Sequence, residues 1–127
     1  INCMKIKTFC FDLDNTLCKT FKNKYKNSKP IKRNIKILNQ LYDRGHTIKI
    51  FTARFMGRSN EKVSLAKKLG YSLTKNQLKK WGIKHHYLIM GKPSFDILID
   101  DKAIGYDANW RNKITKKFKL KKRMRVS

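Results

Sequence analysis

The sequence predicts an α/β fold in which a parallel β-sheet is sandwiched between helices. Two observations lead to this prediction. Short apolar runs, typical of buried strands, alternate with longer segments whose apolar residues recur at helical spacing. Five of only eight acidic residues also fall at such runs: Asp12 and Asp14 after the first, and Asp96, Asp100 and Asp101 around the last. In this class of fold, ligands bind at the carboxyl ends of parallel strands.

In the first half of the chain, the sequence pattern predicts two strands joined by a helix. A strand over residues 6–11 leads into a polar stretch, 15–29, that is rich in Lys and Asn. A helix over 31–44 follows, because apolar residues recur there at helical spacing and Gly45 is typical of a helix end. The second strand spans 47–51. The order strand, helix, strand favours a parallel pair.

The second half of the chain predicts two short helices, each closed by a glycine, and two further strands. The helices are expected over residues 60–69 and 74–81, and the strands over 87–90 and 96–99. Each predicted strand then ends close to a polar or charged side chain. The elements together form one sheet with helical crossovers.

Length and composition indicate a single globular domain. The chain has 127 residues, of which 40% are hydrophobic and 31% charged, which is ordinary for a folded domain with a modest core. We expect the domain to span residues 1–110. Residues 111–127 form a basic C-terminal segment of the same domain or a tail, because 111–125 holds nine Lys or Arg and no acid.

The net charge of +24 has two interpretations. Such a surface attracts polyanions, so nucleic acid is one candidate partner. The other interpretation is compositional drift, because Lys, Asn and Ile are all abundant, as in genomes rich in A and T. We favour drift slightly, because lysines without interleaved aromatic residues lack the stacking platforms of single-strand binders.

The cysteines and the apolar runs bear on location. The three cysteines are Cys3, Cys10 and Cys18, and an odd number favours reduced thiols and a cytoplasmic protein. No run approaches the roughly 18 apolar residues of a membrane span. Met4 is a candidate natural start. The sequence carries no signal for oligomeric state.

The candidate chemistry lies where the predicted strands end. Asp12 and Asp14 are two residues apart, with Thr16 two further on. Two carboxylates this close repel, so a proton or a cation must offset their charge, and Mg²⁺ suits an oxygen-rich site. Asp100 or Asp101 would supply a further ligand. The alternative is that each pair of aspartates consists of turn residues.

Phosphoryl transfer needs a nucleophile, a proton donor, groups that hold the phosphoryl oxygens and a metal that offsets charge. The sequence offers a candidate for each role. These are Asp12 as nucleophile, Asp14 as acid and then base, Thr52 and Lys92 as phosphate holders, and Asp100 or Asp101 as metal anchor.

At these positions the chain resembles the haloacid dehalogenase superfamily of hydrolases that form an aspartyl phosphate. The four motifs of that superfamily are matched in order by residues 12–16, Thr52, Lys92 and Asp100-Asp101. Residues 91–104 further resemble small bacterial phosphatases associated with capsule and surface-polysaccharide biosynthesis. The resemblance covers residues 5–110 and does not extend to the basic C-terminal segment.

This resemblance implies a three-layer, Rossmann-like sheet with helices on both faces, a squiggle and flap after the first strand, and Mg²⁺ dependence. The gaps at 15–30 and 90–96 are too short for a cap domain, so we expect a capless protein with an open site. Arg54 and Arg58, just beyond Thr52, are candidate substrate-binding residues that would clasp an anionic group or sugar hydroxyls. Plain solubilising charge is the alternative for both.

Three functions follow from these observations. The first is a Mg²⁺-dependent phosphatase acting on a small phosphorylated metabolite, most plausibly a sugar or polyol phosphate for surface polysaccharides. The second is a phosphatase acting on the ends of nucleic acid, recruited through the basic surface. The third is a non-catalytic nucleic-acid-binding protein on the same fold, against which the paired carboxylates of Asp12 and Asp14 argue.

Overall fold

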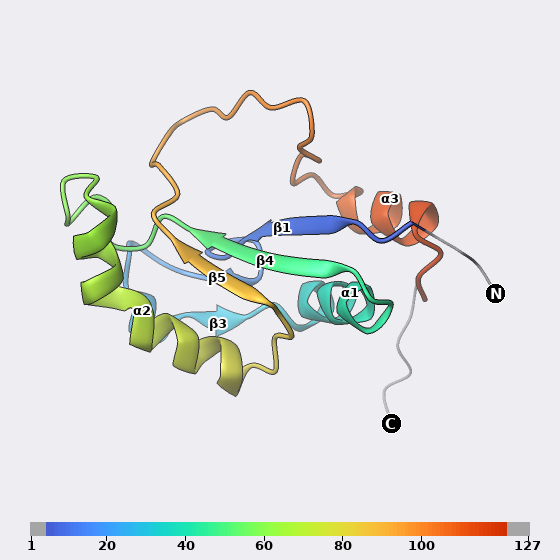
Figure 1. Cartoon of the computed structure of the whole chain (residues 1–127), viewed down its shortest axis with the longest axis horizontal. Helices are drawn as coiled ribbons and strands as arrows, with labels where there is room; N and C mark the ends of the chain where they lie inside the picture. The colour runs from blue at the N-terminus through green and yellow to red at the C-terminus, as the bar shows by residue number, and fades with distance from the viewer. Residues whose placement is uncertain (1–4, 122–127) are drawn as a thin grey trace. The chain divides into compact units, whose positions relative to one another are not determined.

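The computed structural model describes residues 5–121 and divides the chain into two compact units, one ending at Ser94 and the other beginning at Phe95. Unit 1 holds a three-stranded parallel sheet, a small hairpin and two long helices (Figure 1). This confirms the predicted α/β class with a parallel sheet. The expectations for Cys3, Met4 and residues 122–127 of the basic segment lie outside the described residues.

The sheet has the strand order β1-β4-β5, with both neighbouring pairs parallel. Its strands are β1 (Thr8–Asp12), β4 (Thr47–Thr52) and β5 (Tyr87–Met90), which confirms three of the four predicted strands. In the register of the sheet, Asp12 lies beside Phe51 and Thr52 lies beside Met90. The carboxyl ends of all three strands therefore share one edge.

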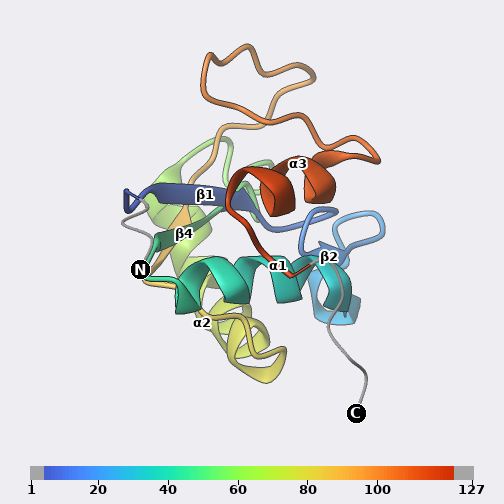
Figure 2. The ribbon, with the colours of Figure 1, turned by 90° about the vertical axis from the view of Figure 1, so that its right-hand side faces the viewer.

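The core of unit 1 lies between the sheet and two helices, α1 (Lys32–Asp43) and α2 (Val63–Lys80). Because both crossovers step in the same direction along the sheet, right-handed connections place α1 and α2 on one face, below the strands in Figure 2. Ile48 and Ile50 of β4 are fully buried, as is Leu38 of α1. Burying one such side chain contributes about 1.5–3 kcal/mol to the free energy of unfolding. The three-layer arrangement stays a prediction.

The helix α2 is continuous where the sequence predicted two helices separated at Gly70. Gly70 lies inside α2 because its missing side chain makes room for an aromatic ring. A Cβ atom at this position would come within 2.4 Å of Cε2 of Phe55. The prediction of a helix end at Gly70 was therefore wrong, since tertiary packing selected the glycine.

Residues 15–30, here called the flap, connect β1 to α1. Two short strands, β2 (Cys18–Lys19) and β3 (Lys29–Pro30), pair antiparallel, and a 3₁₀ turn, η1 (Tyr25–Asn27), lies between them. Leu17 is fully buried and its carbonyl accepts a hydrogen bond from the amide of Ile31 at 2.9 Å. The flap is thereby anchored at both ends.

In unit 2, no helix or strand lies between Phe95 and Asn109, and α3 (Trp110–Lys117) follows. The strand predicted over residues 96–99 was therefore wrong. The side chains of Ile97 and Ile99 are 80% and 94% exposed. The apolar run has the local pattern of a strand but no pairing partner among the described residues. The expected domain boundary after residue 110 falls at the first turn of α3.

Between residues 5 and 121, no helix has the length and apolar content needed to cross a lipid bilayer.

Candidate functional site

The carboxylate of Asp12 stands at the end of β1 with a cation beside it. Its Oδ1 lies 3.2 Å from Nζ of Lys92, and its Oδ2 accepts a hydrogen bond from the hydroxyl of Thr16 at 3.3 Å. The side chain of Asp12 is 36% exposed and that of Lys92 is 17% exposed. The pair therefore meets solvent, where a ligand can reach it. The structure brings together two site residues that are 80 positions apart in the sequence.

Lys92 is placed by a sharp turn after β5. The amides of Gly91 and Lys92 both donate to the carbonyl of Thr52, at 3.1 and 3.0 Å. Gly91 adopts a φ of +101°, which side-chain-bearing residues rarely take. A Cβ atom there would also approach Cγ1 of Val63 to 2.6 Å. The turn needs a glycine, and it directs Lys92 toward Asp12.

Asp14 faces a second cation, Arg54. Nε of Arg54 donates to Oδ2 of Asp14 at 3.0 Å, and Nη2 donates to Oδ1 at 2.9 Å. The hydroxyl of Thr20 donates to the same Oδ1 at 2.5 Å. Asp12 and Asp14 each have their own cation, so the repulsion expected between these neighbouring carboxylates is offset within the protein.

The guanidinium of Arg54 is fully buried, whereas the sequence left it as either a substrate-binding residue or a solubilising surface charge. Its Nη1 donates to Oε1 of Gln77 at 2.5 Å and to Oγ1 of Thr74 at 3.3 Å, both on α2. Its Nη2 also donates to the hydroxyl of Ser28 in the flap at 3.3 Å. In this structure Arg54 therefore joins the loop after β1, the flap and α2, and no part of its side chain meets solvent.

Thr52 and Arg58 occupy different surroundings. Thr52 is fully buried, and its hydroxyl accepts a hydrogen bond from the amide of Arg54 at 3.1 Å. It thus stabilises the turn after β4, and its phosphate-holding role stays a prediction. Arg58 is exposed, lies over the ring of Phe55 at 4.9 Å, and donates to the carbonyl of Asn23 at 3.1 Å. Arg58 therefore contacts the flap.

Asp100 and Asp101 belong to unit 2, where both are exposed. Oδ1 of Asp100 accepts a hydrogen bond from the amide of Lys102 at 2.9 Å, as in an Asx turn. Among residues 5–121, no group of three or more His, Cys, Asp or Glu side chains is placed to hold a metal ion. Unit 1 offers the carboxylates of Asp12 and Asp14. One or two carboxylates, completed by water and substrate oxygens, are a common Mg²⁺ site.

Cys18 lies beside this site, but its thiol is expected to be unreactive. Burial, together with the nearby carboxylate of Asp14, raises the pKa of its thiol to about 11. The thiol points to the carbonyl of Leu13, 3.7 Å away. Cys18 therefore stays protonated at neutral pH and acts as a small packing residue.

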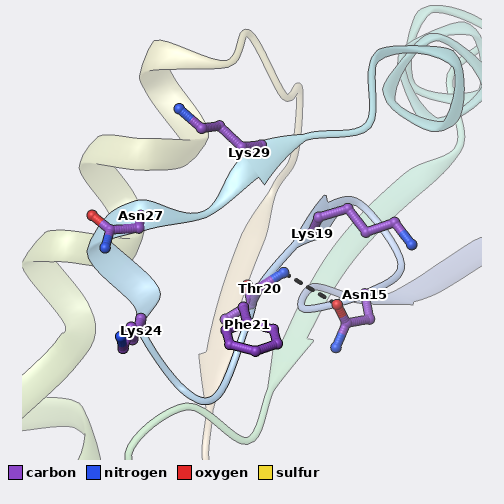
Figure 3. A pocket seen from close by; sticks show the side chains of 7 residues that line it. All are labelled: Asn15, Lys19, Thr20, Phe21, Lys24, Asn27 and Lys29. Carbon is purple, nitrogen blue, oxygen red and sulfur yellow. Dashed lines mark hydrogen bonds between the residues drawn. The ribbon is translucent and has the colours of Figure 1, made fainter.

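The flap itself is hollowed by a pocket of about 620 Å³. Lys19, Lys24 and Lys29 line it, together with Phe21 and polar residues that include Asn15 (Figure 3). This pocket is not evident from the sequence, because it depends on the hairpin that pairs residue 19 with residue 29. The amide of Thr20, bonded to Oδ1 of Asn15 at 3.1 Å, joins the pocket to the loop that carries Asp14.

The comparisons with known proteins show the fold. No protein-family model and no curated protein matches the chain. The crystal structure of a structural-genomics target from Vibrio cholerae is similar, with a TM-score of 0.73 and 24% sequence identity. The likeness covers 89% of this chain and 99% of that one. At that level of identity it shows the α/β fold alone, and the candidate site depends on the side-chain geometry.

Proposed function

We propose that this protein is a Mg²⁺-dependent phosphomonoester hydrolase that acts through an aspartyl phosphate on Asp12. The ion pair between Asp12 and Lys92, solvent-accessible at the carboxyl edge of a parallel sheet, is the observation that carries this proposal. The carboxylate is a nucleophile, and the ammonium group beside it attracts the phosphoryl oxygens that the nucleophile must approach.

In the first step, a carboxylate oxygen of Asp12 attacks phosphorus and the bond to the ester oxygen breaks. The leaving oxygen takes a proton from Asp14. Lys92 offsets the charge on the phosphoryl oxygens. In the second step, water attacks phosphorus, Asp14 accepts a proton from that water, and the bond between phosphorus and the Asp12 oxygen breaks to release inorganic phosphate. Water cleaves the ester overall, so atoms and charges balance.

For Asp14 to act as the acid in this scheme, one of its hydrogen bonds must open. Both of its oxygens accept hydrogen bonds from Arg54 in the structure, and one also accepts from Thr20. A proton on Asp14 therefore requires that one of these contacts opens. Arg54 thus acts as a positioning residue for Asp14, which replaces the expectation that it clasps the substrate.

The solvent-accessible carboxylate of Asp12 fits Mg²⁺, whereas Asp14 would bind the ion only when a contact with Arg54 or Thr20 opens. Asp100 or Asp101 is the further ligand that the sequence resemblance implies. When bound, the ion would neutralise charge that develops on the phosphoryl group. Within the protein, Lys92 supplies one positive charge for the same purpose.

Two substrate classes remain. A small phosphorylated metabolite, such as a sugar or polyol phosphate, is what the resemblance to surface-polysaccharide phosphatases implies for an open, capless site. A phosphorylated end of nucleic acid is the second candidate, and the lysine-lined pocket of the flap favours it.

The test is hydrolysis of a panel of phosphomonoesters with Mg²⁺, including sugar phosphates, polyol phosphates and oligonucleotides with a terminal phosphate. Asp12→Asn should abolish release of phosphate. The matched control is Asp43→Asn, because Asp43 is an exposed aspartate that pairs with Lys84 at 2.7 Å. Wild-type turnover by Asp12→Asn would overturn the proposal, and so would equal loss in both variants.

A further inference from the structure

The flap carries an unusual concentration of positive charge. Between residues 19 and 29 it contains five lysines, two aromatic residues and no acidic residue. Lys19, Lys24 and Lys29 line the pocket, and none of the three makes an ion pair with a described residue. The charge of this pocket is therefore open to an anionic ligand.

The hairpin places two of these lysines opposite each other. Lys19 and Lys29 are cross-strand partners in the pairing of β2 with β3. Figure 3 shows their side chains extending in opposite directions from the hairpin. A ligand with several anionic groups along an extended chain fits this divergent arrangement of positive charge.

An aromatic side chain lines the same pocket as these lysines. Phe21 lines the pocket and is 71% exposed, in the region between Lys24 and Asn15 in Figure 3. Its neighbour Thr20 is fixed by hydrogen bonds to Asn15 and to Asp14, so the backbone beneath the ring is anchored. The expectation of lysines without interleaved aromatic residues is therefore wrong for this segment, because Phe21 and Tyr25 stand between its lysines.

We propose that the flap binds single-stranded nucleic acid, with a base stacked on Phe21 and backbone phosphates along Lys19, Lys24 and Lys29. A lysine-lined groove that carries an exposed aromatic ring is the general design of single-strand binding sites. The pocket of about 620 Å³ falls in the size range of small-ligand sites, which suits one nucleotide unit.

The flap lies next to the proposed chemistry. The hydroxyl of Thr20, a pocket residue, donates to Oδ1 of Asp14 at 2.5 Å. A strand held by the flap would therefore bring its phosphorylated end toward the carboxyl edge of the sheet. The substrate would then be a terminal phosphate of single-stranded nucleic acid, and this last step rests on the proposed hydrolase function.

The first experiment measures binding without turnover. A fluorescent 12-residue oligothymidylate is titrated with the full chain in EDTA and followed by fluorescence anisotropy. Phe21→Ala should weaken binding at least about fivefold, the lower end of the loss for one stacked base. The matched control is Phe95→Ala, which removes another exposed phenylalanine from unit 2 and should bind as the wild type does.

The second experiment separates the flap from the overall charge. The double substitution Lys19→Gln and Lys29→Gln should reduce the slope of log affinity against log salt by about 1.4, the value for two lost phosphate contacts on a single strand. Lys36→Gln with Lys68→Gln removes equal charge from exposed positions on α1 and α2 and should leave the slope within error. Circular dichroism confirms that each variant is folded.

Several outcomes would overturn the inference. If the two double substitutions of lysine weakened oligonucleotide binding equally, binding would reflect the total charge of the protein. Unchanged binding in Phe21→Ala would remove the stacking site, and tighter binding to phosphatidylserine vesicles than to the oligonucleotide would assign the flap to lipid. Asp12→Asn should bind the oligonucleotide as the wild type does. Failure of hydrolysis with intact, flap-dependent binding would therefore refute the proposed function and leave the flap site standing.

Discussion

Arg54 and Asp14 form a two-pronged ion pair that connects the turn after β4 to the loop after β1, with nitrogen to oxygen distances of 2.9 to 3.1 Å. The pair spans 40 positions of sequence. Because the guanidinium also reaches Ser28 and two residues of α2, Gln77 and Thr74, its position depends on three separate segments. Loss of Arg54 should therefore affect both stability and the placement of Asp14.

Arg54→Met should lower the free energy of unfolding by about 3 kcal/mol. Removing one partner of a buried pair typically costs 3–5 kcal/mol, and we take the lower end because the Asp14 side chain is 21% exposed. Urea denaturation measures the change. Arg58→Met, a matched loss of an exposed arginine, should cost less than about 1 kcal/mol. Similar losses in the two variants would contradict the structural role given to Arg54.

The sequence was sufficient to predict the strands that carry the site. Each of β1, β4 and β5 is an apolar run that ends in a polar residue or a turn, and this local pattern predicts both a strand and its carboxyl end. The meeting of Asp12 with Lys92 then follows from parallel pairing.

The sequence was insufficient to predict features that depend on contacts between residues far apart in the chain. Nothing close to Arg54 in the chain indicates burial, because its partners lie between 20 and 40 positions away. Gly70 was read as a helix end, although Phe55 is what requires a glycine there. Residues 96–99 have the pattern of a strand, but a pattern cannot supply the neighbouring strand.

Gly70→Ala should destabilise the protein by about 1–3 kcal/mol, the usual cost of overpacking. This reverses the normal effect, since alanine is favoured over glycine inside a helix by about 1 kcal/mol. The cause is the ring of Phe55, which would lie 2.2 Å from the added Cβ atom. Thermal unfolding measures the loss. Phe55→Leu in the Gly70→Ala background should recover part of it, and additive losses would show that the two sites are independent.

Gly91→Ala should reduce both stability and hydrolysis. Alanine is strained at a φ of +101°, and its methyl group would meet Val63. Either change displaces Lys92 from Asp12, so kcat should fall about tenfold or more if one phosphoryl contact is lost. Gly57→Ala is the control, because a Cβ atom there has nothing within 4 Å. Wild-type kcat in Gly91→Ala would show that the turn does not position Lys92.

Stability should fall as the solution is made more acidic below pH 6.5, partly because of His46. Burial lowers the pKa of His46 below its usual 6.5, and its Nδ1 accepts a hydrogen bond from the amide of Lys7 at 3.0 Å. Between the folded pKa and 6.5, the unfolded chain binds the proton more readily, so stability rises with pH across that window. The free energy of unfolding, measured with urea from pH 4.5 to 7.5, should depend less steeply on pH in His46→Asn than in the wild type. An unchanged slope would assign the acid sensitivity to other groups.

Mg²⁺ should slow hydrogen exchange in residues 96–101 if Asp100 or Asp101 completes the proposed metal site. This segment has no helix or strand, and its apolar side chains at 97 and 99 are largely exposed, so its amides should exchange rapidly without metal. Exchange measured by mass spectrometry with Mg²⁺ or EDTA tests this. Asp12→Asn should lose the protection, because the ion would lose a ligand in unit 1, whereas Asp43→Asn should keep it. Metal-dependent hydrolysis without any protection at 96–101 would mean that the ion is held by unit 1 and substrate oxygens alone.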